Sequence, residues 1–543
     1  MFDSVKGLYV AHCESGSLSI CGRMANRHGL IAGATGTGKT VSLQVLAETF
    51  SQAGVPCFMA DMKGDLSGIS QTGSATSFIQ KRCSEFGLAE PAFSGCPTRF
   101  FDVYGEQGHP MRTTISNMGP QLLSRLMELN DVQEGVLNVL FRVADERGLL
   151  LIDIKDLRSM LAYVAENAAD ISRQYGAVSA TSIAAIQRSL LSLENEGAEK
   201  FFGEPSFDIF DLLQCEGGRG VMSVLAADRL MLNPKLYSTF LLWLLSDLYA
   251  QLPEIGDPEL PKLVFFFDEA HTLFEDTSKA LVSKIEQVIR LIRSKGVGIY
   301  FITQNPTDIP DVILGQLGNR IQHALRAYTP KDQKAVRAAA QTFRSNPSFD
   351  TEEAIMQLET GEALVSFLDE HGAPSVVQRA KMLFPLSQIG VISESQRSQL
   401  INSSRLYGRY DHPVDRESAF EVLLAESEKT RAESAREELP TKDERQSTEK
   451  TERGSASRRQ EETGEKKSKK KGGDALVKSI ATAAVGAAIS SVSRSVGTSV
   501  SNKITGKKSS TTSAKSVAGR AASSAASSVV RNITRSILGN LLK

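Results

Sequence analysis

The chain has 543 residues, more than one ordinary domain, and its 41% hydrophobic and 23% charged residues are the composition of a soluble globular protein. Its net charge is −1, and its six cysteines and seven histidines form no C-x-x-C, H-x-H or H-E-x-x-H pattern, which argues against a zinc site or a disulfide framework. No apolar signal segment opens the sequence, and we expect a cytoplasmic protein with reduced thiols.

The first landmark is the glycine-rich stretch LIAGATGTGKT at residues 30–40. It fits the phosphate-binding pattern G-x-x-x-x-G-K-T, called a P-loop. In such a loop, backbone N–H groups surround phosphate oxygens, the lysine (Lys39) reaches the β and γ phosphates, and the threonine hydroxyl (Thr40) ligates Mg²⁺. We therefore predict ATP and Mg²⁺ as cofactors. The residues assigned to nucleotide binding are Gly33, Ala34, Thr35, Gly36, Thr37, Gly38, Lys39 and Thr40.

The segments around this loop follow the order of a parallel sheet. A short strand over residues 28–32 leads into the loop, apolar spacing predicts a helix over residues 41–50, and residues 55–61 form a buried strand. Because ligands bind at the carboxyl ends of such strands, we expect the polar residues after the second strand to lie near the nucleotide. A purely solvated loop is the alternative. These residues are Asp61, Lys63 and Asp65.

The pattern from about residue 119 to residue 252 is largely helical, with apolar residues recurring at spacings of three and four. Residues 220–225 interrupt it as a predicted strand, and residues 234–252 return to an apolar helix. We interpret the region as a helical insertion on the sheet.

The second landmark is a run of five apolar residues at 263–267, which predicts a strand buried on both faces. An acidic pair follows this run directly. At the end of such a strand, Asp268 is expected to hold Mg²⁺, usually through water. Glu269 is expected to polarise the attacking water as a general base. An acidic pair downstream of a P-loop predicts nucleotide hydrolysis.

Two further polar residues are candidates for the catalytic site. Gln304 ends the strand predicted at 297–303 and is a candidate to touch the γ-phosphate or to orient water. Arg320 is expected in a turn just before a strand at 321–327. An arginine so placed stabilises transition-state charge in a neighbouring subunit or forms a surface salt bridge, and the sequence supports both equally. A hairpin over residues 361–381 is expected to close the fold.

The folded sequence is expected to end near residue 424. Residues 425–471 are a mixed-charge linker, disordered or a solvated helix. Residues 472–543 are a basic tail rich in Ser, Ala and Gly, for which low-complexity disorder is expected and weak amphipathic helices are the alternative. Residues 425–543 hold 24 Lys and Arg against 13 Asp and Glu, whereas residues 1–424 hold 38 against 50. The apolar stripes of the tail lack the roughly 20 uninterrupted residues of a membrane span. The tail is therefore expected to bind an acidic membrane surface, nucleic acid or a protein partner, or to act only as a solubilising segment.

These motifs resemble those of a known family. The inferred strand order, with a strand between those of the P-loop and the acidic pair, is typical of RecA-like ATPases. We therefore predict an α/β RecA-like P-loop core with a mainly parallel central sheet. Over residues 5–424 the sequence is similar to the HerA-like branch of the FtsK and HerA translocases, and most similar to the bacterial YjgR-type proteins. The stretches that carry the resemblance are HGLIAGATGTGKT (28–40), ADMKGDLSG (60–68), FDEAH (267–271), TQNP (303–306) and GNRI (318–321).

The resemblance implies a homo-oligomeric ring, a hexamer, with ATP sites between subunits, DNA in the pore and Arg320 acting in trans. HerA proteins carry an N-terminal β-barrel, whereas about thirty residues precede the P-loop here, so the nuclease-docking role of that barrel is not carried over. The leading hypothesis is a Mg²⁺-dependent ATPase coupled to DNA binding or translocation. The rival is an ATP-switched interaction or assembly protein without a nucleic-acid substrate.

Overall fold

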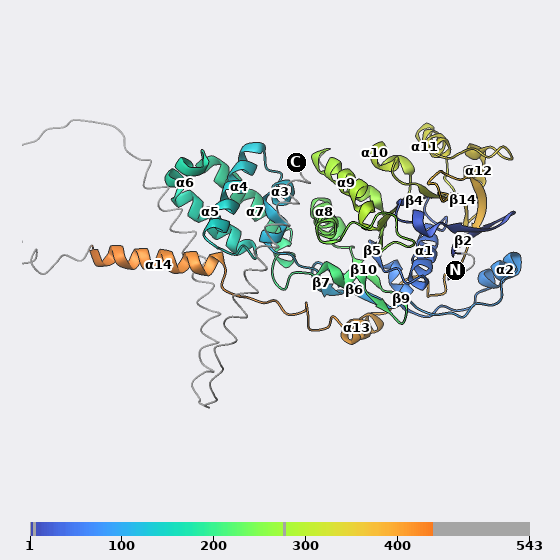
Figure 1. The fold of residues 1–543 in the computed structure, drawn as a ribbon, viewed down its shortest axis with the longest axis horizontal. Helices are drawn as coiled ribbons and strands as arrows, with labels where there is room; N and C mark the ends of the chain where they lie inside the picture. The colour runs from blue at the N-terminus through green and yellow to red at the C-terminus, as the bar shows by residue number, and fades with distance from the viewer. Residues whose placement is uncertain (1, 4–6, 275–278, 438–543) are drawn as a thin grey trace, which may run out of the picture. The chain divides into compact units, whose positions relative to one another are not determined.

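The computed structural model describes residues 2–3, 7–274 and 279–437 of the chain (Figure 1). Of these, the residues up to Ser427 form one compact unit, and residues 428–437 belong to a second. The first unit holds the predicted domain of residues 1–424. The start of the predicted linker is helical, because helix α14 runs over Ala419–Glu437. The rest of the linker and the tail, from residue 438, lie outside the described residues.

One large sheet is the framework of the first unit. Its central strands are parallel, and the strands on one side are antiparallel. In spatial order the strands are β1 (Phe2–Asp3), β2 (Gly7–Cys13), β15 (Gln378–Met382), β14 (Glu362–Ser366), β13 (Asn319–Gln322), β4 (Gly29–Ala32), β12 (Val297–Thr303), β11 (Leu263–Phe267), β5 (Cys57–Asp61), β10 (Met222–Ala226), β6 (Thr98–Asp102) and β7 (His109–Pro110), with β3 (Gly16–Ile20) paired to β2. A short separate hairpin joins β8 (Cys215–Glu216) to β9 (Arg219–Gly220).

The order of the central strands confirms the predicted fold class. Strand β12 lies between the P-loop strand β4 and the acidic-pair strand β11, and all three run parallel. Their carboxyl ends therefore meet at one edge of the sheet. The predicted closing hairpin is also present as the antiparallel pair β14 and β15.

The alternation of side chains along β11 explains why it is apolar throughout. Leu263, Phe265 and Phe267 pack into one hydrophobic core, and Val264 and Phe266 pack into another on the opposite face of the sheet. Because successive side chains of a strand point to opposite faces, a strand covered on both sides needs apolar residues at every position.

Helices cover both faces of the sheet (Figure 1). Apolar residues of α1 belong to the second of these cores, and those of α3, α8 and α9 to the first. The helices are α1 (Lys39–Gln52), α2 (Ser77–Phe86), α3 (Ile115–Leu126), α4 (Asp131–Glu146), α5 (Ile154–Glu166), α6 (Ala168–Tyr175), α7 (Ala180–Asn195), α8 (Pro234–Gln251), α9 (Lys279–Ile292), α10 (Asp311–Leu314), α11 (Pro330–Gln341), α12 (Thr351–Gln357), α13 (Glu394–Ser403) and α14. None of the helices within the described ranges is long and apolar enough to cross a membrane.

The helical insertion is narrower than the predicted range of residues 119–252. The run of helices without a sheet strand is α3–α7, and after it the chain returns to the sheet through β10. Strand β10 lies between β5 and β6, so it is a central strand and not an interruption in the insertion. Helix α8 then packs on the sheet core. The prediction erred because residues 220–225 form a short apolar segment between two helical regions, and its partners are far away in sequence.

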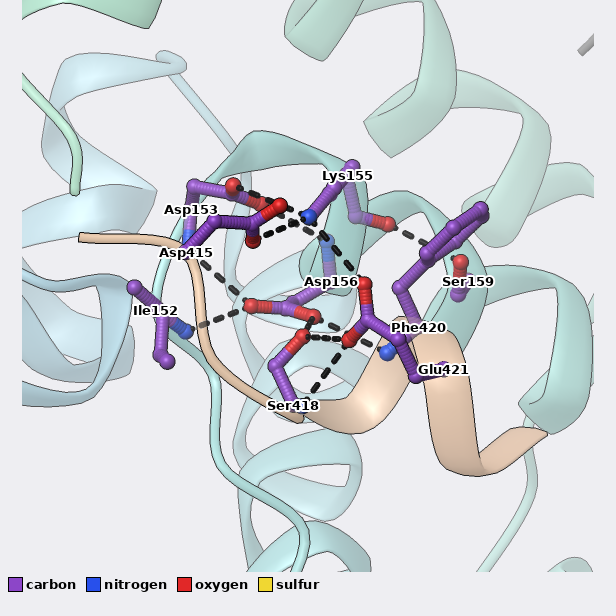
Figure 2. Close-up of polar contacts among 9 residues, drawn as sticks. All are labelled: Ile152, Asp153, Lys155, Asp156, Ser159, Asp415, Ser418, Phe420 and Glu421. Atoms are coloured by element: carbon purple, nitrogen blue, oxygen red, sulfur yellow. Dashed lines mark hydrogen bonds and ion pairs between the residues drawn. The ribbon is translucent and has the colours of Figure 1, made fainter. Parts of the chain in front are cut away.

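The segment that leads into α14 is fastened to the helical insertion (Figure 2). The buried Asp156 carboxylate accepts hydrogen bonds from the Ile152 N–H at 2.7 Å, the Phe420 N–H at 2.9 Å and the Ser418 hydroxyl. Beside it, the Lys155 ammonium pairs with Asp415 at 2.9 Å and with Glu421. Because the buried carboxylate is fully hydrogen-bonded, this contact, which we call the Asp156 clasp, stabilises the end of the first unit.

Candidate nucleotide-binding site

The glycine-rich loop lies between β4 and α1, as its sequence predicts. Gly33, Gly36 and Gly38 have backbone φ angles of 155°, 78° and 109°, which side-chain-bearing residues rarely adopt. A Cβ added to Gly33 would also lie 2.5 Å from the Cβ of His323. Thr35 and Gly36 are exposed at the tip of the loop. Positive φ angles and a close backbone approach are what a loop needs to wrap around phosphate oxygens.

Backbone hydrogen bonds hold the loop against the two neighbouring strands. The Gly33 N–H donates to the Thr303 carbonyl at 3.3 Å, at the end of β12, and the Ala34 N–H donates to the Ala324 carbonyl at 2.8 Å. The Thr37 hydroxyl donates to the Ala34 carbonyl at 2.7 Å inside the loop. The position of the loop is therefore determined by the strands on both of its sides.

The Lys39 side chain is folded into the loop. Its Nζ donates to the Gly33 carbonyl at 2.7 Å and to the Ala34 carbonyl at 3.1 Å. Burial lowers the pKa of Lys39, while the charges of Glu269 and Asp268 oppose this. The ammonium therefore lies where phosphate oxygens would enter the loop, and those oxygens would replace the carbonyls as its partners.

A buried histidine that the sequence analysis did not single out supports the loop. His323 Nδ1 lies 2.9 Å from the Glu362 carbonyl, and its Nε2 lies 2.9 Å from the Ser42 hydroxyl on α1. Burial lowers the pKa of His323 to about 4, so the ring is neutral at pH 7. Nδ1 then donates to the carbonyl and Nε2 accepts from the hydroxyl. His323 joins α1 to β14, a role that no local sequence pattern indicates.

The acidic pair follows β11 at the same edge of the sheet. Asp268 and Glu269 are both 5% exposed. Burial raises the pKa of Asp268 to about 6, and the charge of Glu269 adds to this rise. Glu269 has a φ of 45°, in the left-handed region that is strained for a residue with a side chain. Strain of this kind persists where the surrounding contacts hold it, and the Glu269 carboxylate has several.

Three side chains surround the Glu269 carboxylate. Lys63 Nζ forms an ion pair with Oε1. Gln304 Nε2 donates to Oε2 at 3.3 Å, and His271 Nδ1 lies 3.4 Å from Oε2. Burial alone would raise the pKa of Glu269, but the hydrogen bond and charge of Lys63, with Gln304 and His271, bring it below its ordinary value. Glu269 is therefore held as an ionised carboxylate, the form that a general base requires.

Two carboxylates, Asp61 at the end of β5 and Asp65 in the segment after it, lie close to the acidic pair. Burial, together with the charges of Asp65 and Asp268, raises the pKa of Asp61 to about 7. Asp61 Oδ2 accepts from the Leu66 N–H at 3.2 Å, whereas its Oδ1 and the Oδ1 of Asp65 are buried without a hydrogen-bond partner among the described residues. Crowded carboxylates with free oxygens suit a hard cation such as Mg²⁺.

The residues present fit a magnesium–nucleotide complex. Asp268 supplies a carboxylate, and Thr40 lies half-buried in the first turn of α1. Within the described part of the chain, no three His, Cys, Asp or Glu residues are grouped so as to hold a metal by themselves. Phosphate oxygens and water would therefore complete the coordination, as is usual for Mg²⁺.

Arg320 is placed differently from the prediction. It lies inside β13, opposite Leu30, and not in a turn before the strand. The strand begins early because the Asn319 amide donates to the Met24 carbonyl at 3.0 Å and to the His28 carbonyl at 3.2 Å. The Arg320 guanidinium donates to the carbonyls of its own chain at Leu314 (3.0 Å), Leu317 (2.9 Å) and Thr342 (3.1 Å).

The structure thus brings Lys39, Lys63, Asp268, Glu269 and Gln304 together. It does not bring Arg320 to them, because the Arg320 guanidinium is bound to the carbonyls of Leu314, Leu317 and Thr342. Asp61 and Asp65 lie near this group, and the alternative of a purely solvated loop is wrong for Asp61, which is 2% exposed. The sequence analysis expected Lys63 near the nucleotide but did not predict its ion pair with Glu269.

Comparison with known proteins agrees with this site. Residues 8–509 match the family described as Helicase HerA-like C-terminal. The chain belongs to this family. The match continues beyond residue 424, farther than the motifs of the sequence reach. Because it belongs to this family and carries a P-loop, the HerA-like chain is a P-loop ATPase.

The similar curated proteins include two DNA double-strand break repair helicases named HerA. The one from Sulfolobus acidocaldarius is 31% identical over 99 residues, which are 18% of this chain and 19% of the relative. The one from Sulfurisphaera tokodaii is 33% identical over 108 residues, 20% of each chain. The HerA-like chain therefore spans about one fifth of the length of the curated relatives it matches.

Similar solved structures include a plasmid coupling protein and a VirB4 protein. The plasmid coupling protein TrwB, in complex with the non-hydrolysable ATP analogue ADPNP, has a TM-score of 0.47 and 16% identity, covering 70% of this chain and 91% of TrwB. VirB4 of Thermoanaerobacter pseudethanolicus has a TM-score of 0.42 and 14% identity, covering 74% of this chain and 99% of VirB4. At these values the likeness says nothing about substrate.

Proposed function

We propose that this HerA-like chain hydrolyses ATP in the presence of Mg²⁺ and couples hydrolysis to binding or moving along DNA. The observation that supports this best is the convergence of Lys39, the Asp268–Glu269 pair and Gln304 at one edge of the sheet. Those side chains come from three elements, the P-loop helix and the ends of β11 and β12, and they meet only in the folded chain.

Each of these side chains has a task that follows from its contacts. Lys39, at the mouth of the P-loop, balances the charge of the β and γ phosphates. Glu269 accepts a proton from the attacking water, since its carboxylate is kept ionised and held by Lys63. Gln304, exposed at the end of β12 and in contact with Glu269, orients that water or the γ-phosphate. Thr40 and Asp268 would hold Mg²⁺, which when bound neutralises developing phosphate charge.

The DNA substrate and the ring are supported by family membership and by the resemblance. HerA relatives are named as DNA double-strand break repair helicases. In a ring, the nucleotide lies between subunits and a neighbour completes the site, and a hexamer is the state that the resemblance implies. Residues 1–424 carry a net negative charge, with 38 Lys and Arg against 50 Asp and Glu. Contacts to DNA must therefore come from local groups of basic residues.

The deciding experiment measures steady-state ATP hydrolysis by the full chain with and without double-stranded DNA at two salt concentrations. The Glu269→Gln variant serves as the blank. We expect DNA to stimulate hydrolysis, and the stimulation to weaken as salt rises, because phosphate contacts release counterions. Hydrolysis that is indifferent to DNA at both concentrations would overturn the coupling to DNA. It would favour the ATP-switched interaction protein, with the tail as the place to look for its partner.

A further inference from the structure

A polar cavity lies among helices α3, α4, α8 and α9, apart from the nucleotide site. Its volume is about 400 Å³. Helix α3 packs against α4 and α8, and α8 packs against α9. Arg125 of α3 and Lys284 of α9 both line the cavity. None of the residues assigned to nucleotide binding or catalysis does, so the cavity is a separate feature.

The two cations of this cavity are not paired with a carboxylate in the described part of the chain. Within the described ranges, neither Arg125 nor Lys284 forms an ion pair, and Lys284 Nζ has a long hydrogen bond of 3.4 Å to Gln287 Oε1. Glu134 lines the same cavity but is paired with neither cation. Two other cations on these helices are paired: Lys235 with Glu128 at 2.8 Å and Arg142 with Glu146 at 2.6 Å.

The two cations of the cavity lie close enough for their charges to interact. Burial lowers the pKa of Lys284 from its ordinary value, and the charge of Arg125 lowers it further. Two like charges that face one cavity destabilise the folded chain. An anion bound between them would remove this cost, because a ligand that binds the folded state stabilises it.

An amide completes the set of donors. Gln121 of α3 lines the cavity, and its Oε1 is buried without a hydrogen-bond partner among the described residues. The two ends of a glutamine amide are exchanged by a rotation, so Gln121 can direct its NH₂ group into the cavity. A guanidinium, an ammonium and an amide are the donors that recognise phosphate oxygens.

We propose that this cavity binds a phosphate group, carried by a free polyphosphate or by the backbone of a nucleic-acid strand. The volume lies in the range of small-molecule sites and leaves room for the group that carries the phosphate. The site is independent of the P-loop, and only its nucleic-acid source rests on the proposed coupling to DNA.

The first experiment tests the free polyphosphate. Thermal unfolding of the full chain carrying Lys39→Ala, which weakens binding at the P-loop, is measured with and without inorganic pyrophosphate. We expect pyrophosphate to raise the melting temperature, and the added pair Arg125→Gln and Lys284→Gln to abolish this rise. A control pair, Arg142→Gln and Lys235→Gln, removes two charges from neighbouring positions and should keep it. Without pyrophosphate, the Arg125→Gln and Lys284→Gln pair should melt no lower than its parent, because repulsion is removed.

The second experiment tests the nucleic-acid source in the same two pairs of variants, with a short DNA duplex as the probe. Loss of Arg125 and Lys284 should weaken binding about tenfold. It should also reduce the slope of log K against log salt by about 1 to 2, whereas the control pair leaves both nearly unchanged. Arg125→Lys with Lys284→Arg, which keeps both charges, should restore binding.

The two experiments distinguish a free polyphosphate from a nucleic-acid backbone as the source of the bound phosphate. A pyrophosphate effect that depends on Arg125 and Lys284 supports a free polyphosphate, and a duplex effect that depends on them supports a nucleic-acid backbone. If neither the melting shift nor duplex affinity differs between the Arg125→Gln and Lys284→Gln pair and the control pair, the proposal is wrong. Made separately in the chain that keeps Lys39, both pairs should hydrolyse ATP at the basal rate of the unsubstituted chain, so a failure of the proposed ATPase activity would be recognised separately.

Discussion

Lys63 and Glu269 form an ion pair that joins the loop after β5 to the carboxylate after β11. The side chain of Lys63 is 54% exposed, whereas that of Glu269 is only 7% exposed. The carboxylate is thus the fixed partner, held also by Gln304, and the lysine reaches it from the solvent side. A general base needs a defined orientation and an ionised state, and this pair contributes to both.

Replacing the lysine should affect turnover and not nucleotide affinity. In Lys63→Met, the Glu269 carboxylate loses the partner that orients it and lowers its pKa, so we expect kcat for ATP hydrolysis to fall by about tenfold. The dissociation constant for ATP should change less than about twofold, because Lys63 does not belong to the P-loop. Lys81→Met, which removes a lysine that is 78% exposed, is the control. An unchanged kcat would show that the ion pair has no part in hydrolysis.

Two other variants should distinguish the loss of ATP binding from the loss of ATP hydrolysis. Lys39→Ala removes the ammonium from the mouth of the P-loop and should weaken ATP binding and abolish turnover. Glu269→Gln keeps the shape of the side chain but cannot take a proton, so it should bind ATP and lose at least about 10²-fold in kcat. Nucleotide titration and steady-state hydrolysis on both variants give the comparison. Equal hydrolysis by Glu269→Gln and the parent would remove Glu269 from the role of general base.

The contacts of Arg320 lead to a stability prediction. Its guanidinium donates to three carbonyls, two of them at the ends of α10 and α11. We expect Arg320→Ala to lower the free energy of unfolding by about 3 kcal/mol, because these charge-assisted hydrogen bonds are lost in a half-buried place. Arg326→Ala is the control, since Arg326 is exposed and bonds one carbonyl, that of Met356 at 3.0 Å. If Arg320→Ala keeps full stability and ATP binding but loses hydrolysis, the role in trans expected from the resemblance is the better description.

A buried histidine predicts acid sensitivity. His28 Nε2 lies 2.9 Å from the Ile289 carbonyl and its Nδ1 accepts from the Ile299 N–H at 3.0 Å. Burial lowers the pKa of His28 from 6.5 to about 4. Between these values the unfolded chain binds more protons than the folded chain. The stability that neutral His28 contributes is therefore complete above pH 6.5 and is lost as the pH falls towards 4.

The variant His28→Asn should remove this contribution, and asparagine tolerates the φ of 57° at this position. The difference in unfolding free energy between parent and variant should shrink by about 2 kcal/mol from pH 7.5 to pH 5. Chemical denaturation at both pH values measures it, and other titrating groups cancel in the difference. A difference that stays constant with pH would mean that His28 does not titrate as its burial requires.

The sequence could predict the features that are written in short stretches. The P-loop, the acidic pair after an all-apolar strand and the closing hairpin depend on neighbouring residues, and each is found where it was expected. The Lys63–Glu269 pair joins residues 206 positions apart and the His323–Ser42 contact joins residues 281 positions apart. Local spacing contains no information about such contacts.

Arg320 shows a second reason why the sequence alone did not predict the structure. The sequence predicted a turn before the strand, but the buried Asn319 amide, with its partners at Met24 and His28, draws the residue before Arg320 into β13. Strand β10 is a similar case, because five residues between helical segments join two distant strands. In both cases tertiary hydrogen bonds, and not local preference, determine where the strand lies.

The Asp156 clasp determines where mechanical load would enter the molecule. Beyond it, Glu426 pairs with Arg147 at the end of α4, and Ser427 is the last described residue of the first unit. The described residues from 415 to 427 are therefore joined to the helical insertion and not to the edge of the sheet that holds the P-loop. If the tail is anchored to a surface or to a partner, tension along it would reach α4 and α5 first, and the nucleotide site would feel that tension only through the packing of those helices.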